Sequence, residues 1–454
     1  MTTRRDFLRR SAAFGSAGLL SSALPGMSAL AQAGGGYKAL VCVFLAGGMD
    51  GHDTIIPRDA ESYGEWATTR ARLLELYAAE GDDSRTRDAL IPLGAQSDGR
   101  QMAMPPQMAG LAERYADGKL AVLANVGPLV APTTGAQAAA QSVPLPPRLM
   151  SHNDQQSTWQ AMGPEGTSSG WGGRMADAMR ASSEFSAVSI SGNPVFLAGG
   201  ASQPFVMSKQ GVRTVHATRN WAYGSRDVPA AFEAHLGASA ASMDNWLGSD
   251  FQAAQRRAVA SVNELAAMTD ATTAGDEVAI EDNDLAGQLA MVAKMISLRD
   301  RLGVSRQVFF VKMGGFDTHD DQPKTLPARQ AQLSSALSSF YRWTVAQGVA
   351  DSVTSFTASD FGRTLTTNAT GTDHGWGNHH LVLGGAVAGG RIEGLVPPGA
   401  EGHGQDFGRG RMVPTVATTQ YAGALGSWFG LTDAQLRDVL PGIERFGTNG
   451  VRLF

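Results

Sequence analysis

Short apolar runs alternate with helical patterns along most of the chain. Residues 39–45 and 308–311 are almost continuously apolar, as expected for strands covered on both faces. Alternating strands and helices predict an α/β fold with a doubly wound, mostly parallel sheet flanked by helices. The predicted strands are residues 38–45, 120–126, 187–190, 195–198, 307–313, 353–358 and 381–383, and the predicted helices are residues 106–115, 285–302, 325–345 and 433–440.

Capping residues mark the start of two of these helices. Asp284 directly precedes an apolar helical face and predicts an N-cap at that position. Thr432 and Gln435 have the spacing of a capping box at the start of the last helix.

The first 33 residues have the pattern of an export signal. Arg4 and Arg5 are followed, after one residue, by two apolar residues, which fits the twin-arginine pattern. A mildly apolar stretch then ends at Ala33 in a small-x-small site for a signal peptidase. Because the stretch contains glycine, serine and proline, it is a poor membrane anchor. We expect residues 1–33 to be removed after passage through the twin-arginine translocase, which gives a periplasmic or secreted protein with no stable membrane span. A cytoplasmic protein with a basic tail is the alternative.

The rest of the chain, residues 34–454, is predicted to form a single domain. Residues 127–147 are rich in alanine, proline, threonine and glutamine and predict a long loop. The helical block around residues 230–302 is expected to be an insertion packed on the sheet.

Composition excludes one class of partner and one kind of crosslink. The formal net charge is −5, without the basic excess that nucleic-acid binding requires. The single cysteine, Cys42, lies in an apolar run, so we expect a buried, inert thiol and no internal disulfide. Glycine accounts for 55 of the 454 residues, or about 12%, which exceeds its usual share of about 7%. Many stand beside acidic residues or histidines, which indicates loops in which the backbone approaches another group closely.

Three of the predicted strands are each followed by an aspartate. Asp50 and Asp317 follow Gly-Gly pairs after the first strand and after 307–313, and Asp360 follows 353–358. The carboxyl ends of parallel strands converge at the sheet edge where open α/β sheets bind ligands. Taken singly, each acid is explained as well by a turn or a helix cap.

Histidines accompany these acids. His319 comes two residues after Asp317, and His374, His379 and His380 fall within a glycine-rich segment beside Asp373. Converging carboxylates repel one another unless a cation neutralises them. Since carboxylate and imidazole together suit a divalent metal ion, the pattern predicts a metal site, or phosphate contact by at least one histidine.

Several motifs, in this order, resemble the family known as domain of unknown function 1501. The resemblance covers essentially all of residues 34–454. That family often carries twin-arginine signals and is placed with the alkaline phosphatase and sulfatase superfamily. It therefore implies an alkaline phosphatase-like fold with a two-metal site at the strand ends. The motifs are LAGGMD, GGFDTHDDQ, SDFGRT, TDHGWGNHH, GGRIEG, GRGRMVPT and QYAGALGSWFGL.

The resemblance also implies ligand roles for particular residues. In the superfamily the acid after the first strand binds one metal ion, a role that would fall on Asp50. A later aspartate with a nearby histidine binds the other, which would be Asp317 with His319. Asp360 corresponds to a further strand-end acid, and His374 corresponds to a late histidine ligand.

The chain departs from the superfamily at one position. Phe361 stands where a second histidine is usual, and His379 or His380 is the candidate that would compensate.

Candidates for the nucleophile and the anion clamp complete the predicted site. The superfamily places a serine, threonine or modified cysteine at a helix start, and the sulfatase pattern Cys-x-Pro-x-Arg is absent. Ser151 precedes a helix-like stretch and is the candidate nucleophile, with a plain N-cap as the alternative. Arg363, or Arg409 with Arg411, is the candidate for clamping an anion.

Two functional hypotheses follow. The first is an exported metal-dependent hydrolase of phosphate or sulfate esters, acting on an anionic small molecule or polymer. Its cofactor would be a divalent ion, with zinc, manganese and calcium not distinguished. The second is a non-catalytic metal-binding protein of the same fold that acts as a binding or assembly factor.

Overall fold

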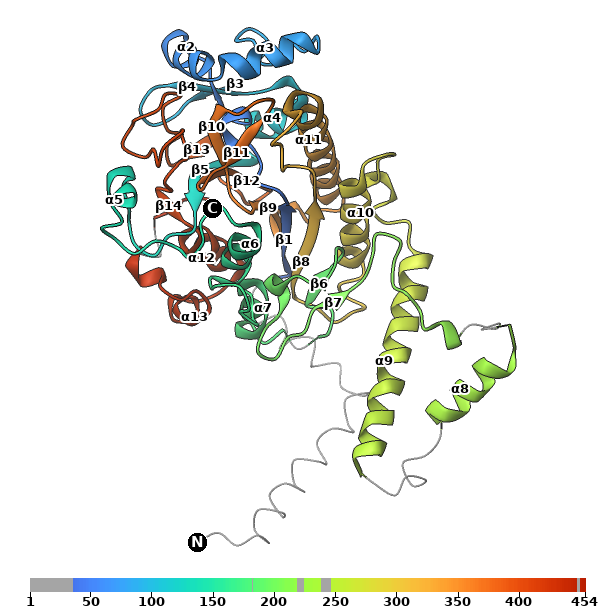
Figure 1. Ribbon diagram of the computed structural model, residues 1–454. Helices are drawn as coiled ribbons and strands as arrows, with labels where there is room; N and C mark the ends of the chain where they lie inside the picture. Colours follow the sequence, from blue (N-terminus) through green and yellow to red (C-terminus); the bar gives the residue numbers. More distant parts are fainter. Residues whose placement is uncertain (1–35, 182, 219–223, 238–245, 447–449) are drawn as a thin grey trace, which may run out of the picture. The chain divides into compact units, whose positions relative to one another are not determined.

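The computed structural model describes residues 36–454 apart from 182, 219–223, 238–245 and 447–449 (Figure 1). The predicted export signal, residues 1–33, lies outside the described residues. Lys38–Phe454 forms one compact unit. In the described part of the chain, every helix is too short or too polar to span a bilayer.

A large mixed sheet lies at the centre of this unit (Figure 1). Its pairings are parallel except for those of one strand, β12, which runs antiparallel to both of its neighbours. The predicted α/β class with a mostly parallel sheet is thus confirmed. In spatial order the strands are β13 (Arg391–Glu393), β5 (Leu120–Gly127), β12 (Asn378–Gly384), β9 (Val353–Ser359), β1 (Lys38–Leu45), β8 (Arg306–Met313), β6 (Ala187–Ser189) and β7 (Phe205–Val206), with β14 (Val416–Ala417) also paired to β5.

Helices cover both faces of the sheet, which explains why the central strands are apolar throughout. On one face Leu40, Cys42 and Phe44 of β1 belong to the main core cluster, together with side chains of four helices. The alternate residues of β1 are equally buried and point to the opposite face, which a second set of helices covers. The first set is α6 (His152–Ala161), α7 (Trp171–Ala178), α12 (Thr418–Phe429) and α13 (Asp433–Val439), and the second is α4 (Ala109–Ala116), α10 (Asp284–Ser297) and α11 (Gln322–Ala346).

Two details of the sequence prediction need correction. Residues 195–198 are not a strand, because Pro194 begins a 3-10 helix, Val195–Leu197, that buries two side chains in the core. The N-cap of α10 is Asn283 rather than Asp284, since the Asn283 side chain accepts a hydrogen bond from the backbone N–H of Ala286. The predicted capping box at the start of α13 is confirmed.

Smaller elements surround the main sheet. A short helix, α5, lies within the predicted loop 127–147, and α8 and α9 fall in the predicted insertion. Within the described residues, the smaller elements form two further sheets and five α-helices. The sheets are a three-stranded one of β2 (Ile56–Pro57), β4 (Gln101–Met104) and β3 (Ile91–Ala95) and a two-stranded one of β10 (Arg363–Thr367) and β11 (Thr372–His374). The helices are α2 (Ala60–Thr69), α3 (Ala71–Ala79), α5 (Gly135–Ala139), α8 (Asp227–Gly237) and α9 (Trp246–Ala271).

Three adjacent strands end at the same level of the sheet. Leu45 at the end of β1 lies opposite Ser359 of β9 on one side and Met313 of β8 on the other. The loops that follow therefore emerge side by side, as the sequence predicted for the strand-end acids.

Two glycines allow these loops to approach one another. Gly47 and Gly48 have φ of +116° and +87°, in the region that favours glycine. A Cβ on Gly48 would lie 2.6 Å from the Phe361 ring, and one on Gly47 would overlap the backbone of Asp317. Any larger residue at either position would push the loops apart.

Candidate metal centre

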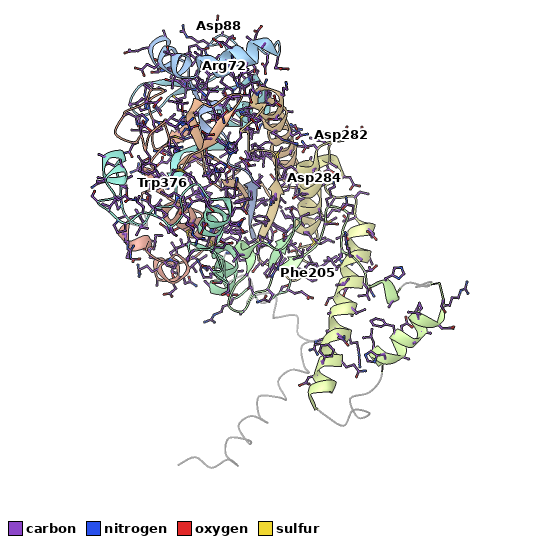
Figure 2. All side chains as sticks on the ribbon, viewed as in Figure 1. Arg72, Asp88, Phe205, Asp282, Asp284 and Trp376 are labelled. Carbon is purple, nitrogen blue, oxygen red and sulfur yellow. The ribbon has the colours of Figure 1, made fainter. Side chains whose placement is uncertain are left out.

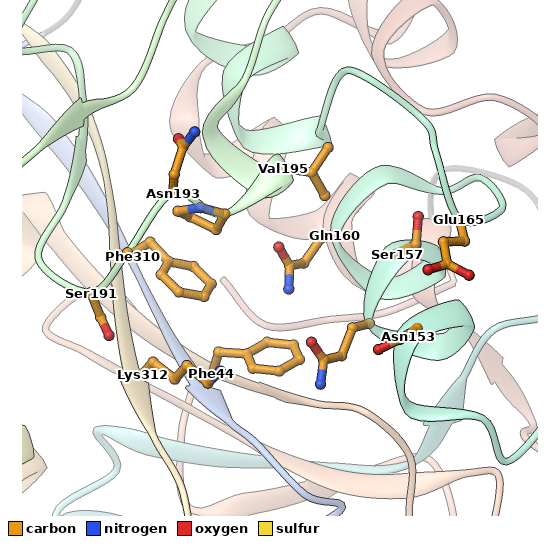
Figure 3. Close-up of a pocket in the computed structure, with 13 residues that line it drawn as sticks. Phe44, Asn153, Ser157, Gln160, Glu165, Ser191, Asn193, Val195, Phe310 and Lys312 are labelled. Atoms are coloured by element: carbon orange, nitrogen blue, oxygen red, sulfur yellow. The ribbon is translucent and has the colours of Figure 1, made fainter.

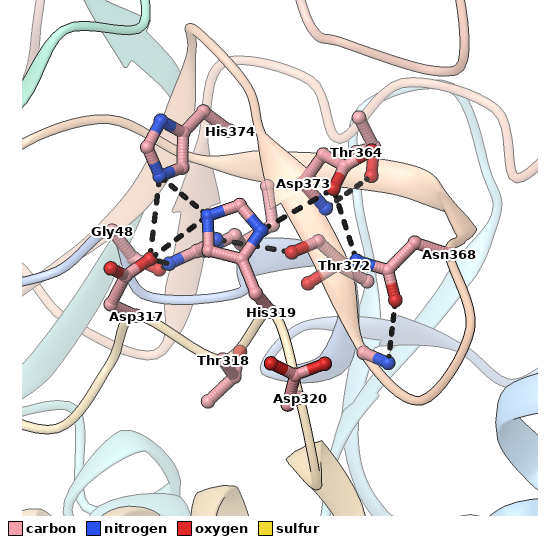
Figure 4. Close-up of polar contacts among 12 residues, drawn as sticks. Gly48, Asp317, Thr318, His319, Asp320, Thr364, Asn368, Thr372, Asp373 and His374 are labelled. Carbon is pink, nitrogen blue, oxygen red and sulfur yellow. Dashed lines mark hydrogen bonds and ion pairs between the residues drawn. The ribbon is translucent and has the colours of Figure 1, made fainter.

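Three histidines and one aspartate meet just beyond the ends of β8 and β9, and Figure 4 shows two of the histidines, His319 and His374, beside Asp317. One ligand atom each from His152, Asp317 and His374 lies within 4.8 Å of the other two. His319 joins them, with its Nε2 atom 2.8 Å from His374 Nε2 and 3.3 Å from Asp317 Oδ1. In the part of the chain that the structure describes, this is the group whose potential ligand atoms converge in this way.

The four residues come from three different segments. Asp317 and His319 lie in the loop after β8, His374 ends β11, and His152 begins α6. The segment after β11 is fixed by Trp376 (Figure 2), which is fully buried and donates its indole N–H to the Pro128 carbonyl at 2.8 Å.

Each imidazole is held from behind by an oxygen atom. In every case the oxygen faces Nδ1 of the ring, so that Nε2 points toward Asp317 or its immediate neighbourhood. Outer partners of this kind typically fix the orientation of metal-binding histidines. The pairs are His152 with Asp360 Oδ2 at 2.6 Å, His374 with the Met150 carbonyl at 2.8 Å, and His319 with Asp373 Oδ1 at 3.3 Å.

These oxygens assign the tautomers. Carboxylate and carbonyl oxygens only accept hydrogen bonds, so Nδ1 of each neutral ring is the donor and Nε2 keeps its lone pair. His319 Nε2 and His374 Nε2 then present lone pairs to each other across 2.8 Å. That arrangement is repulsive unless a proton or a metal ion lies between the two atoms. Burial, together with the nearby Arg363 charge, lowers the pKa of His374, which disfavours a proton on that ring.

The spacing of the donors also fits a metal ion. His374 Nε2 is 3.3 Å from Asp317 Oδ1, and His152 Nε2 is 3.4 Å from Asp317 Oδ2. Two donors bound tetrahedrally at zinc distances are about 3.3 Å apart. The side chains remain 23 to 46% exposed, so that solvent or a ligand can reach the cluster.

Charge at the cluster is balanced by neighbouring groups. Partial burial raises the pKa of Asp317, but the hydrogen bond and charge of Arg363 outweigh this effect and lower it. The hydrogen bond to Asp360 raises the pKa of His152. Burial likewise opposes ionisation of Asp373, yet hydrogen bonds from Asn368 and Arg409 bring its pKa to about 2. Asp317 and Asp373 are therefore ionised at neutral pH.

Asp360 stands behind the cluster rather than among the converging atoms. It is fully buried, and its Oδ1 accepts from the backbone N–H of Gly47 at 3.2 Å. Its Oδ2 accepts from His152 and, at 2.9 Å, from Gln156 Nε2. The structure therefore gives Asp360 the position of a residue that orients His152.

Arg363 connects the loops beneath the cluster. Its buried guanidinium donates to the Gly48 carbonyl at 2.9 Å and to the Phe316 carbonyl at 3.1 Å, and it forms an ion pair with Asp317. These bonds hold the loops after β1 and β8 together. Phe361 packs against the histidines, with its ring centroid 4.4 Å from that of His374 and 4.8 Å from that of His152.

Asp50 lies outside the cluster and has hydrogen-bond and ion-pair partners of its own. Its buried carboxylate forms an ion pair with Arg70 and accepts from Gln322 Nε2 at 2.8 Å and from the Asp53 N–H at 3.1 Å. An arginine of the chain already neutralises this carboxylate, and Asp50 is not among the converging ligand atoms of the metal centre.

His379 and His380 lie in the core on β12. Both are fully buried, and burial lowers the pKa of each to about 3, so they are neutral. His379 Nδ1 accepts from the Asn125 N–H at 3.0 Å, and His380 Nδ1 lies 3.2 Å from Thr357 Oγ1. A neutral imidazole in the core brings no positive charge to an anion at the cluster.

Ser151 directly precedes His152 and occupies the N-cap position of α6. Its hydroxyl makes no capping bond to the helix backbone and instead donates to Asp154 Oδ2 at 2.8 Å. The Ser151 hydroxyl therefore does not cap the helix, in contrast to the alternative interpretation of this residue as a plain N-cap.

His152 is the residue of the cluster that the sequence did not single out. It follows Ser151 in the chain, but its partner Asp360 is 208 residues away, so that no local spacing connects them.

The comparison with known families agrees with the resemblance seen in the sequence. A family model described as "Protein of unknown function (DUF1501)" matches residues 37–442, and the chain belongs to this family. No protein of curated function matches the chain.

Proposed function

We propose that this DUF1501 protein is an exported, metal-dependent hydrolase of phosphate or sulfate esters. The observation that carries the proposal is the cluster in which three imidazoles turn their Nε2 atoms toward Asp317 while oxygens hold each Nδ1 from behind. Kinship with the alkaline phosphatase superfamily and twin-arginine export are parts of the same proposal, supported by the sequence motifs alone.

His152, Asp317 and His374 would hold the ion, with His319 beside them. This set of imidazoles and one carboxylate favours zinc or a similar transition ion over calcium, which prefers an all-oxygen shell. When bound, such an ion polarises a phosphoryl or sulfuryl oxygen.

Ser151 is the proposed nucleophile. Its Oγ–H already donates to Asp154 Oδ2, so that this carboxylate is placed to accept the proton as Oγ attacks the ester. The ester bond to the leaving group then breaks, and the alcohol oxygen that departs takes a proton from solvent. Water subsequently releases phosphate or sulfate from the serine.

Turnover of aryl phosphates and aryl sulfates tests the proposal, with zinc, manganese or calcium added in turn. We expect Ser151→Ala to lower turnover by about a thousandfold or more with an unchanged metal content. Ser142→Ala, at an exposed loop position, is the matched control. A metal-loaded protein that turns over none of these esters would contradict the proposal.

A non-catalytic metal-binding protein, acting as a binding or assembly factor, is the second candidate. The position of His319 favours it, because a fourth protein ligand would close the tetrahedral shell that a catalytic zinc keeps open. X-ray absorption spectroscopy of the zinc form distinguishes the two. A shell of four protein ligands supports the structural role, and three with one exchangeable oxygen support catalysis.

Export has its own test. Replacing Arg4 and Arg5 by lysine should retain the protein in the cytoplasm when cell fractions are compared, whereas unchanged localisation would refute the twin-arginine route.

A further inference from the structure

A cavity of about 440 Å³ lies between the start of α6 and the carboxyl ends of β1 and β8 (Figure 3). Its volume is in the range of small-molecule sites. The helix that forms one wall also contributes His152 to the metal centre, and Asn153 and Gln156, within the next turn, line the cavity.

One residue joins the cavity to the metal centre directly. Gln156 lines the cavity and donates its Nε2–H to Asp360, the carboxylate that holds His152. A ligand in the cavity therefore lies one side chain away from the outer partner of the cluster.

The cavity walls are rich in carboxamides. A carboxamide offers both donor N–H groups and an acceptor oxygen, and a hydroxyl group likewise donates and accepts. Figure 3 shows Gln160 and Asn193 beside the same space. The four carboxamide residues of the lining are Asn153, Gln156, Gln160 and Asn193.

The floor of the cavity is apolar. Phe44 of β1 and Phe310 of β8 lie on the same face of the sheet, with ring centroids 5.9 Å apart and planes at 27°. The lining contains one basic and one acidic side chain, Lys312 and Glu165, so that it carries no net charge. These walls and this floor suit a ligand with many hydroxyl groups and an apolar C–H face, rather than an anion.

We infer that this cavity binds an uncharged sugar ring. As a statement about substrate, the inference rests on the proposed function: the ester would be carried on a saccharide, with the sugar in the cavity and the phosphate or sulfate group at the metal centre. As a statement about binding, it stands on the cavity alone.

Calorimetric titration of the zinc-loaded protein tests the inference without any turnover. The probes are glucose, galactose, N-acetylglucosamine and a trisaccharide of each, with inorganic phosphate and a neutral tripeptide as comparison ligands. We expect at least one saccharide to bind saturably, with a dissociation constant of about 10 µM to 1 mM.

Gln160→Leu, which removes the carboxamide at similar size, should weaken this binding at least about tenfold. Asn193→Ala should do the same, and it serves as the second variant if Gln160→Leu does not fold. Gln347→Leu, at an exposed position at the end of α11, is the matched control and should leave the affinity unchanged.

Absence of saccharide binding, or binding of phosphate or peptide alone, overturns the inference. The outcome is separate from that of the proposed function. Saccharide binding without ester hydrolysis would refute only the hydrolase, and hydrolysis without saccharide binding would refute only the sugar site.

Discussion

Asp360→Asn is the substitution that most directly tests the architecture of the metal centre. The two carboxylate oxygens receive three N–H donors: the Gly47 backbone at 3.2 Å, His152 Nδ1 at 2.6 Å and Gln156 Nε2 at 2.9 Å. An asparagine offers one accepting oxygen and one NH₂ group, so that its NH₂ must face at least one of these donors.

Both orientations of the new amide have a cost. If its oxygen faces His152, the Gly47 N–H loses its buried acceptor, which lowers the free energy of unfolding by about 1–3 kcal/mol. If its NH₂ faces His152, then Nδ1 must accept, the proton moves to Nε2, and that atom can no longer bind a metal ion. In either case the negative charge that strengthens His152 as a ligand is lost.

Replacing an outer partner of a histidine ligand typically weakens metal binding by about 10- to 100-fold, or about 1.4–2.7 kcal/mol. We expect this loss in the zinc dissociation constant, measured by competition with a chromogenic chelator. The apo protein should also unfold at a lower urea concentration. Asp282→Asn, at an exposed position before α10, is the matched control for both measurements. A zinc affinity equal to that of the wild type would refute the assignment of Asp360 as the partner that orients a ligand.

Further predictions concern pH and two arginines. Protonated His152 cannot bind a metal ion, and its hydrogen bond to Asp360 raises its pKa. Zinc affinity should therefore be at its maximum well above that pKa and fall as the pH drops through it. A zinc dissociation constant that does not change between about pH 8 and about pH 5.5 would count against His152 as a ligand. Arg70→Met should leave the buried Asp50 carboxylate without its ion-pair partner and lower the free energy of unfolding by about 3–5 kcal/mol in urea titrations. The zinc content per chain should stay the same, and a changed content would restore Asp50 as a ligand candidate. Arg409→Gln should raise the pKa of Asp373 and weaken zinc binding by less than about tenfold, and an effect as large as loss of a ligand would contradict an indirect role.

Much of the main sheet could be predicted from the sequence because its strongest signals are local. The nearly continuous apolar runs became β1 and β8, and the acids after them lie at the sheet edge where parallel strands end. The grouping of Asp317, His319 and His374 follows from that placement together with the glycine-rich segment around β11.

Two similar motifs nevertheless have aspartates with different ion-pair partners. Asp50 and Asp317 each follow a strand and a Gly-Gly pair, yet one carboxylate pairs with Arg70 and the other with Arg363. The difference comes from the segment between β2 and β4, whose helices bring Arg70 to the first loop. The sequence contains no local feature that reveals this pairing, since it depends on where a non-adjacent helix packs.

The position of His152 depends on α6, a helix with an unusual balance of polar and apolar residues. Trp159 and Ala161 anchor its carboxyl end in the core, whereas its amino end buries polar side chains such as Asp154 and Gln155. That end is held largely by polar contacts, among them the bond from His152 to Asp360. An ion bound by His152 would therefore also stabilise the amino end of α6, because binding free energy is shared with the structure that presents the ligand. The same helix forms a wall of the adjacent cavity, so that the metal centre and the cavity share one structural element.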